Sequence, residues 1–151
     1  MTSHAPKPTP EQSYQTILIV WAALLFSQVL FIPMVLMIKP ELMGLDLSKP
    51  LLGSEPVVSV ALAAVSVVAL IASFILRKKI LARSVDQQDV SLVQTAVIVG
   101  CALCESVSLF GFLTAFLFEY QYFFLFSAAG IGGTLLHFPR RDDVHAASYK
   151  K

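Results

Sequence analysis

The sequence has few charged residues for its length. Of 151 residues, 14% are Asp, Glu, Lys or Arg, and the formal net charge is +1. A soluble domain of this size carries roughly a quarter charged residues, so this shortage excludes an ordinary soluble domain. The small net charge, with no basic run interleaved with aromatic residues, argues against nucleic acid as a partner. With 56% hydrophobic residues, the composition instead predicts a protein of the lipid bilayer.

Cysteine and histidine are also scarce, which limits the available chemistry. Cys101 and Cys104 have the spacing of a redox or metal pair, but both lie inside a long apolar stretch. There they lack the accessible, electropositive setting that makes a thiolate reactive. His137 stands alone at the end of the last apolar stretch, so we expect no metal site and no haem. With no nucleophile–base pair or phosphate loop in view, we expect no catalytic residues, no cofactor and no enzyme activity.

Long uncharged runs fill most of the chain. They predict an all-α fold, an integral membrane bundle of four transmembrane helices within residues 17–138. The expected helices lie at about residues 17–38, 57–76, 92–118 and 122–138. Residues 1–16 are expected to form a flexible tail, and residues 139–151 a polar one. The first run lacks the small-x-small cleavage site of a signal peptide, which favours a retained first helix.

Basic residues are distributed unevenly along the chain. Segments 1–16, 77–91 and 138–151 hold nine of the eleven Lys and Arg residues, and the 39–56 loop holds the other two. The positive-inside rule therefore predicts that both termini and the central basic loop are cytoplasmic. We expect the protein to lie in a bacterial inner membrane, surrounded by lipid, as a homo- or hetero-oligomer with other membrane subunits.

The predicted third helix carries one acidic residue, Glu105, near the middle of Val93–Phe118. A carboxylate at that depth costs roughly 2.5 kcal/mol even on lenient insertion scales, so it needs a partner or a proton. One interpretation is that Glu105 exchanges protons or cations; the other is that a protonated Glu105 hydrogen-bonds a neighbouring helix and only holds the bundle together. The candidate residues for an ion-binding site around Glu105 are Gln28, Ser66, Ser106 and Ser108.

Small residues recur at helical spacing in the predicted helices. Steps of three and four place them on one face, where they let a second backbone approach closely. We therefore predict that these faces pack against neighbouring helices. The packing residues on the third and fourth helices are Cys101, Cys104, Gly111, Ala115, Gly130 and Gly133. A matching row on the second helix comprises Ser59, Ala63, Ser66 and Ser73.

The segment Ala102–Phe118 (ALCESVSLFGFLTAFLF) resembles the carboxylate-bearing helix of the rotary ATP synthase c subunit, the proteolipid. Glu105 matches the ion-carrying carboxylate of that family, and Ser106 resembles the residue that follows it in sodium-binding members. Leu109-Phe110-Gly111 matches the aliphatic-aromatic-glycine triplet. A preceding helix joined by a basic cytoplasmic loop also fits. The resemblance implies a c-like membrane subunit that exchanges ions at Glu105.

The sequence departs from the c-subunit pattern in two places. The predicted second helix lacks the repeated glycines of ring-forming inner helices, and the loop has Arg83 and Gln87 without the Arg-Gln-Pro motif. These departures put ring formation in doubt. The alternative is a structural or accessory subunit of a larger membrane complex, in which Glu105 serves only as a hydrogen bond between helices.

Overall fold

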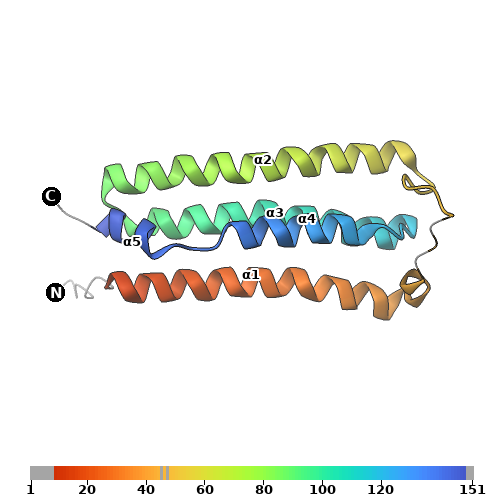
Figure 1. The fold of residues 1–151 in the computed structure, drawn as a ribbon, viewed down its shortest axis with the longest axis horizontal. Coiled ribbons are helices and arrows are strands. Elements are labelled where there is room, and N and C mark those ends of the chain that lie inside the picture. Colours follow the sequence, from red (N-terminus) through yellow and green to blue (C-terminus); the bar gives the residue numbers. More distant parts are fainter. Residues whose placement is uncertain (1–8, 45, 47, 149–151) are drawn as a thin grey trace, which may run out of the picture.

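The computed structural model of the chain describes residues 9–44, 46 and 48–148, and every regular element in that part is helical (Figure 1). The longer helices are α1 (Pro10–Ile38), α2 (Pro56–Gln87), α3 (Val90–Phe118) and α4 (Phe123–Leu136). A 3-10 helix, η1 (Pro40–Met43), follows α1, and a short helix, α5 (Arg141–Ser148), follows α4. The predicted all-α class is confirmed.

Three helices, α1, α2 and α3, are long and apolar enough to cross a membrane. They indicate an integral membrane protein. The fourth predicted span, residues 122–138, is shorter than expected, because α4 begins at Phe123 and unwinds at His137, ahead of Pro139. Its 14 residues extend about 21 Å at about 1.5 Å per residue, which is less than the roughly 30 Å hydrocarbon core.

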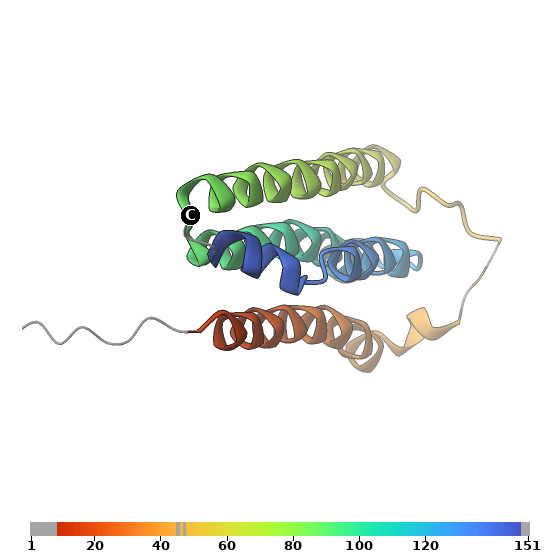
Figure 2. The ribbon, with the colours of Figure 1, turned by 60° about the vertical axis from the view of Figure 1, so that its left-hand side comes forward.

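Helix α3 lies at the centre of the molecule. Both α2 and α4 pack against it along their lengths, and α4 also reaches α1. In the described part of the chain, α1 and α2 do not contact each other and lie on opposite sides of the α3–α4 pair (Figures 1 and 2). One face of α3 is therefore left uncovered. Its exposed residues are Ile98, Leu109, Leu113 and Leu117, which suit contact with lipid.

Helix α1 begins within the predicted flexible tail. The Thr9 side chain accepts a hydrogen bond from the Gln12 N–H at 3.3 Å, and Gln12 Oε1 accepts one from the Thr9 N–H at 3.0 Å. This reciprocal pair is a capping box, and Pro10 suits the first helical position that follows it. Residues 10–16 are therefore helical, which corrects the predicted tail; residues 1–8 lie outside the described part.

Helix α2 continues past its predicted end at residue 76. It runs through the basic triplet Arg77-Lys78-Lys79 and ends at Gln87. Lys and Arg are good helix formers, so charge here marks the edge of the apolar segment and does not stop the helix. The helix ends where Gln88 takes a left-handed conformation with φ of 52°.

Helix α3 starts two residues earlier than predicted. Asp89 Oδ1 accepts a hydrogen bond from the Ser91 N–H at 2.9 Å, so Asp89 is the N-cap. The sequence offers both a capping-box spacing at Ser91 and an acidic residue at Asp89, and the structure uses the latter. The other end of α3, at Phe118, agrees with the prediction.

The predicted polar tail at 139–151 contains helix α5. Its buried residues are Val144 and Ala147, three positions apart, and Asp142 and Asp143 occupy its first turn, where acidic side chains favour a helix N-terminus. Helix α5 packs against α1, α2 and α3, at the end of the bundle where α1 begins (Figure 2). Residues 149–151 lie outside the described part.

At the opposite end, two tyrosines hold the long α1–α2 connection. The Tyr120 hydroxyl donates to the Leu51 carbonyl at 2.7 Å, and the Tyr122 hydroxyl donates to the Lys49 carbonyl at 3.0 Å. Tyrosines in a short connection between membrane helices are common at the membrane interface, where they often lie free. Instead both tyrosines are buried against the connection and fix it to the α3–α4 turn.

An ion pair links the end of α1 to the end of α3. Lys39 Nζ lies 3.0 Å from Glu119 Oε1. The hydrogen bond from Lys39 lowers the pKa of the Glu119 carboxyl, and the same bond raises the pKa of the Lys39 ammonium. Glu119 is therefore paired, although its exposure to solvent weakens the attraction.

Candidate functional site

Glu105 lies halfway along α3, partly buried, on the side that faces α1. Its Oε1 atom is 2.6 Å from the Ser27 hydroxyl oxygen on α1. The rings of Phe31 and Phe112 meet further along the same two helices, with centroids 5.6 Å apart. Ile98 and Leu109, one or two turns away on α3, belong to the uncovered face. Glu105 therefore sits at the boundary between the α1–α3 interface and that face.

The Ser27 hydroxyl faces two acceptors. Its oxygen is 2.8 Å from the Leu24 carbonyl and 2.6 Å from Glu105 Oε1. A serine hydroxyl has one hydrogen, so it donates to only one acceptor at a time. With a protonated Glu105, the carboxyl donates to Ser27 and Ser27 donates to Leu24, which pairs every group. With an ionised Glu105, the Ser27 hydroxyl donates to the carboxylate instead, and the Leu24 carbonyl loses its hydrogen bond from Ser27.

Gln28, the next residue, points to a different set of partners. Its Nε2 donates to Thr134 Oγ1 on α4 at 2.7 Å, and its Oε1 accepts from Ser108 Oγ on α3 at 3.1 Å. The Trp21 indole N–H donates to the Thr134 carbonyl at 2.8 Å. The Gln28, Ser108 and Thr134 residues are all 0% exposed. This neutral network, called here the Gln28 network, joins α1, α3 and α4.

The predicted ion-binding residues do not form one site. Gln28 and Ser108 are bonded to each other, and neither bonds Glu105 in the part of the chain that the structure describes. The Ser106 hydroxyl donates to a carbonyl one turn earlier in α3 at 2.9 Å. The Ser66 hydroxyl donates to a carbonyl one turn earlier in α2 at 2.7 Å. Because α2 and α1 lie on opposite sides of α3–α4, Ser66 belongs to another interface.

Glycines allow α4 to approach the backbone of α3. A Cβ atom at Gly130 would lie 2.6 Å from the Cys104 carbonyl and would also collide with the Ser108 hydroxyl. At Gly133 it would lie 2.7 Å from Cys104 Sγ. At Gly111 on α3 it would lie 2.7 Å from a backbone carbonyl of α4. The α3–α4 contact thus depends on the absence of side chains at these positions.

Both cysteines are free and buried. Cys104 Sγ lies 3.7 Å from Ser73 Oγ on α2, and Cys101 belongs to an apolar cluster with Ile17. Ala115 is buried in a second cluster near the other end of α3. Among the described residues, no group of three or more His, Cys, Asp and Glu is placed to hold a metal ion.

The row of small residues on α2 is only partly buried. Ser59, Ser66 and Ser73 are buried, whereas Ala63 is exposed. The predicted row placed Ala63 on the packing face, but the buried serines follow each other at intervals of seven. Ala63, one turn from both Ser59 and Ser66, lies at the edge of that line, where its side chain is exposed.

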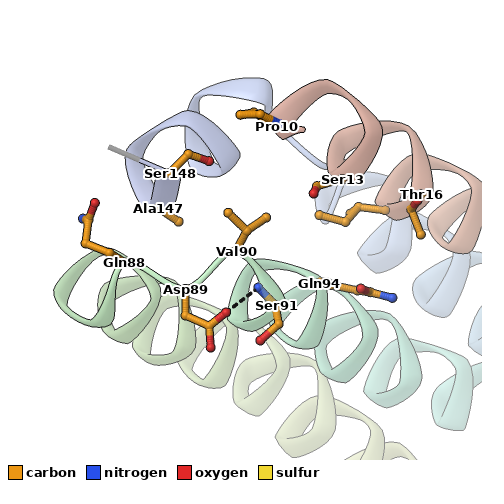
Figure 3. Close-up of a pocket in the computed structure, with 11 residues that line it drawn as sticks. Pro10, Ser13, Thr16, Gln88, Asp89, Val90, Ser91, Gln94, Ala147 and Ser148 are labelled. Carbon is orange, nitrogen blue, oxygen red and sulfur yellow. Dashed lines mark hydrogen bonds between the residues drawn. The ribbon is translucent and has the colours of Figure 1, made fainter. Parts of the chain in front are cut away.

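A cleft of about 520 Å³ opens at the end of the bundle where α1 and α3 begin (Figure 3). Pro10 from α1, Gln88 from the α2–α3 turn and Ser148 from α5 line it together. Asp89 supplies the one formal charge in its lining, and its carboxylate caps α3. The cleft shows that the described start of α1, the α2–α3 turn and α5 share one end of the molecule.

Sequence reasoning missed Ser27 altogether, and it placed Thr134 on a packing row of the fourth helix without connecting it to Gln28. Ser27 adjoins Gln28 in the sequence and lies at the same depth, so the sequence offered it as a partner of Glu105 on the same grounds. Neighbouring residues on a helix point about 100° apart, so the choice between them depends on how α1 is rotated. A helix that is apolar all round gives no pattern that fixes this rotation.

Comparison with protein-family models, curated proteins and solved structures gives no match for this chain.

Proposed function

We propose that this chain is a small integral membrane protein in which Glu105 binds and releases a proton near the middle of the bilayer. The observation that carries the proposal is the contact of 2.6 Å between the Ser27 hydroxyl and Glu105. The carboxyl is only partly buried and borders the uncovered face of α3. An acidic group that exchanges an ion must be reachable from outside its own bundle, and Glu105 meets this condition.

The surroundings of Glu105 favour a proton over a metal cation. Hard cations need several oxygen ligands at once. Ser106 and Ser108, which the c-subunit resemblance would supply, direct their hydroxyls to other groups. A proton needs only the carboxylate itself: the protonated Glu105 carboxyl donates a hydrogen bond to the Ser27 oxygen, and the Ser27 hydroxyl turns to donate to the Leu24 carbonyl.

The Gln28 network favours exchange over a purely structural role. It already joins α1, α3 and α4 with neutral, fully buried groups. A carboxylate in the same layer carries an insertion penalty of roughly 2.5 kcal/mol, whereas the Gln28 amide is neutral and hydrogen-bonded at both ends. The alternative function is an accessory subunit in which Glu105 only joins helices. The Ser27–Glu105 bond supports that alternative too, because it links α1 directly to α3.

The same proposal includes a topology. The chain returns along the bundle after α3, so that α5 packs at the end where α1 begins, which supports four crossings despite the short α4. Exposed basic residues lie near the end of the bundle where α1 begins. In a bacterial inner membrane, the positive-inside rule would place this end on the cytoplasmic side. These residues are Lys78, Lys79, Arg83, Arg140 and Arg141.

The test is the reaction of Glu105 with a hydrophobic carbodiimide, which attacks protonated carboxyls within lipid. We expect the full-length protein in vesicles to be modified at Glu105, with a rate that falls as the pH rises. Glu105→Gln should fold and remain unmodified. Glu119→Gln, which removes the exposed carboxyl at the end of α3, should react as the natural sequence does.

Two results decide between the candidate functions. A rate that is unchanged from acidic to alkaline pH would contradict proton exchange. If Glu105→Gln kept the α1–α3 contact and every ion-dependent activity of the protein, the accessory role would be favoured, because glutamine keeps the hydrogen bond to Ser27 but cannot ionise. Ser27→Ala provides a further check. If Glu105 exchanges a proton, the pH dependence of its labelling rate should differ between this variant and the natural sequence.

A further inference from the structure

Arg77 is a mostly buried cation at the end of the apolar part of α2. Its side chain is 13% exposed, and its Nη2 donates a hydrogen bond to the Phe138 carbonyl at 3.2 Å. Asp143 Oδ2 lies 3.6 Å from the same nitrogen, which is too far for a hydrogen bond. The described part of the chain thus satisfies one nitrogen of a planar guanidinium group whose fork can bind two oxygen atoms of a phosphate or carboxylate.

Arg140 brings a second guanidinium group to the same end of α2. It is exposed, and its positive charge acts against that of Arg77. The next residue, Arg141, is paired, because its Nη2 lies 3.5 Å from Glu11 Oε1. Arg140 has no ion pair with any residue that the structure describes. Asp143 offsets one of the two charges, and the other favours an anion beside Arg77 and Arg140.

An apolar surface leads away from these arginines along α2 and α4. On α4 its residues recur at steps of three and four, which places them on one face. That face flanks Gly133, where a Cβ atom would lie 2.9 Å from Leu70 Cδ2 on α2. Helices α2 and α4 contact each other less than either contacts α3, so the surface between them stays at least partly exposed. This surface, called here the α2–α4 strip, comprises Ala63, Val67 and Phe74 on α2 and Leu125, Ala129, Gly132 and Leu136 on α4.

Gly132 shows that the α2–α4 strip has room for a ligand. The glycines at 130 and 133 are explained by close contact with other helices, because a Cβ atom at either would collide with a neighbour. At Gly132 a Cβ atom meets nothing within 4 Å, so no described part of the chain fills the space beside it. Leu136 is 70% exposed one turn later on the same face. A flexible hydrocarbon chain laid along α4 would cover both residues.

We propose that an anionic glycerophospholipid binds at this place, with its phosphate group beside Arg77 and Arg140 and an acyl chain along the α2–α4 strip. A phosphate accepts charge-assisted hydrogen bonds from guanidinium groups. Basic residues between membrane helices commonly bind anionic headgroups. A lipid fits better than a free phosphate ion, because the charged and the apolar parts of the surface are continuous. The proposal requires that the chain lies in a membrane, and it does not depend on the role of Glu105.

Native mass spectrometry of the full-length protein in detergent micelles tests the lipid site. Phosphatidylglycerol and phosphatidylcholine with the same acyl chains are added separately, and the affinity of the first bound molecule is measured for each. We expect phosphatidylglycerol to bind about tenfold or more tightly, because the choline group would bring another positive charge towards the two arginines. Equal affinities for the two lipids would overturn the proposal.

Arg140→Gln should remove most of the preference for phosphatidylglycerol. Its melting temperature without lipid should equal that of the natural sequence, since Arg140 forms no ion pair with a described residue. Arg83→Gln is the matched control, because it removes the same charge from an exposed position of α2 that is turned by about 240° from Arg77. This control should keep the preference. Equal losses in the two variants would indicate diffuse attraction between charges and would overturn the site.

Two further measurements separate the headgroup from the acyl chain. Asp143→Asn removes the carboxylate that lies beside Arg77, so phosphatidylglycerol should bind this variant more tightly; weaker or unchanged binding would contradict the position of the phosphate. Glycerol phosphate carries the same anionic group without acyl chains, and an excess of it should leave phosphatidylglycerol bound. Complete displacement of the lipid by glycerol phosphate would show that the α2–α4 strip contributes nothing, and it would overturn the proposal of a lipid.

Discussion

Gln28 and Glu105 show how two polar residues at one depth take different roles. The Gln28 amide is fully buried, and both its ends bond other helices. The Glu105 carboxyl is only partly buried, and it is hydrogen-bonded to the Ser27 hydroxyl, which can rotate to donate to either of two acceptors. The first arrangement is suited to holding helices together, and the second to gaining and losing a proton.

Replacing Gln28 with Leu should destabilise the bundle. The change leaves the Ser108 and Thr134 hydroxyls without their shared partner, and buried hydrogen bonds between membrane helices contribute about 0.6–1.7 kcal/mol each. We expect a loss of about 1–3 kcal/mol in the free energy of unfolding, measured in mixed detergent micelles. Gln15→Leu, at an exposed position of the same helix, is the control. An equal effect of the two changes would refute the structural role of the network.

The sequence indicated at what level along its helix each polar residue lies, but not which neighbouring helix its side chain faces. The uncharged runs placed Gln28, Ser108 and Glu105 near one level of the membrane, and the structure brings the first two into contact. The partner of Glu105 is Ser27, because α1 is rotated so that Gln28 faces α4. In a helix that is apolar on all sides, this rotation is set by packing against its neighbours, which a single sequence does not display.

Helix boundaries follow from capping chemistry more than from charge. The second helix was predicted to end at residue 76, just before the basic triplet that starts at Arg77, yet α2 continues to Gln87. The charge marks where the apolar segment ends, and the left-handed Gln88 marks where the helix ends. Similarly, α5 was missed because two buried apolar positions in eight residues form too short a pattern to detect.

Glycine substitutions on α4 test the close contact between α3 and α4. We expect Gly130→Ala to lower the free energy of unfolding by about 1–3 kcal/mol, because the added methyl group meets the backbone of α3. Gly132→Ala is a matched control two residues away, where a Cβ atom meets nothing within 4 Å. It should be neutral or slightly stabilising, since alanine favours a helix more than glycine does. Thermal unfolding of the two variants in detergent measures the difference, and equal melting temperatures would contradict the contact.

At the scale of the whole molecule, α3 and α4 form a central pair with α1 and α2 on opposite sides. The composition and the apolar runs correctly indicated a helical membrane protein, and three of the four predicted spans are long and apolar enough to cross a membrane. They did not indicate that the first two helices would be kept apart. Helices adjacent in sequence usually neighbour each other in space, and here the long connection around η1 allows α2 to cross to the far side of α3.

Cysteine labelling tests the topology. In a background where Cys101 and Cys104 are replaced by alanine, we expect Gln88→Cys and Ser48→Cys to react with a membrane-impermeant maleimide from opposite sides of the membrane. Both positions are exposed. The α2–α3 turn and the α1–α2 connection, in which they lie, are at opposite ends of the bundle. The Gln88→Cys variant should react from the cytoplasmic side. Reaction of both variants from one side would contradict the proposed crossings.

The separation of α1 from α2 has a consequence for synthesis of the protein. The first helix has no contact with the second, so its polar Gln28 must wait for Ser108 and Thr134, which are translated about 80 to 106 residues later. At roughly 5–20 residues per second, the ribosome needs several seconds to supply them. During that interval we expect the nascent first helix to hold an amide that no protein group has yet satisfied, which is costly in an apolar environment.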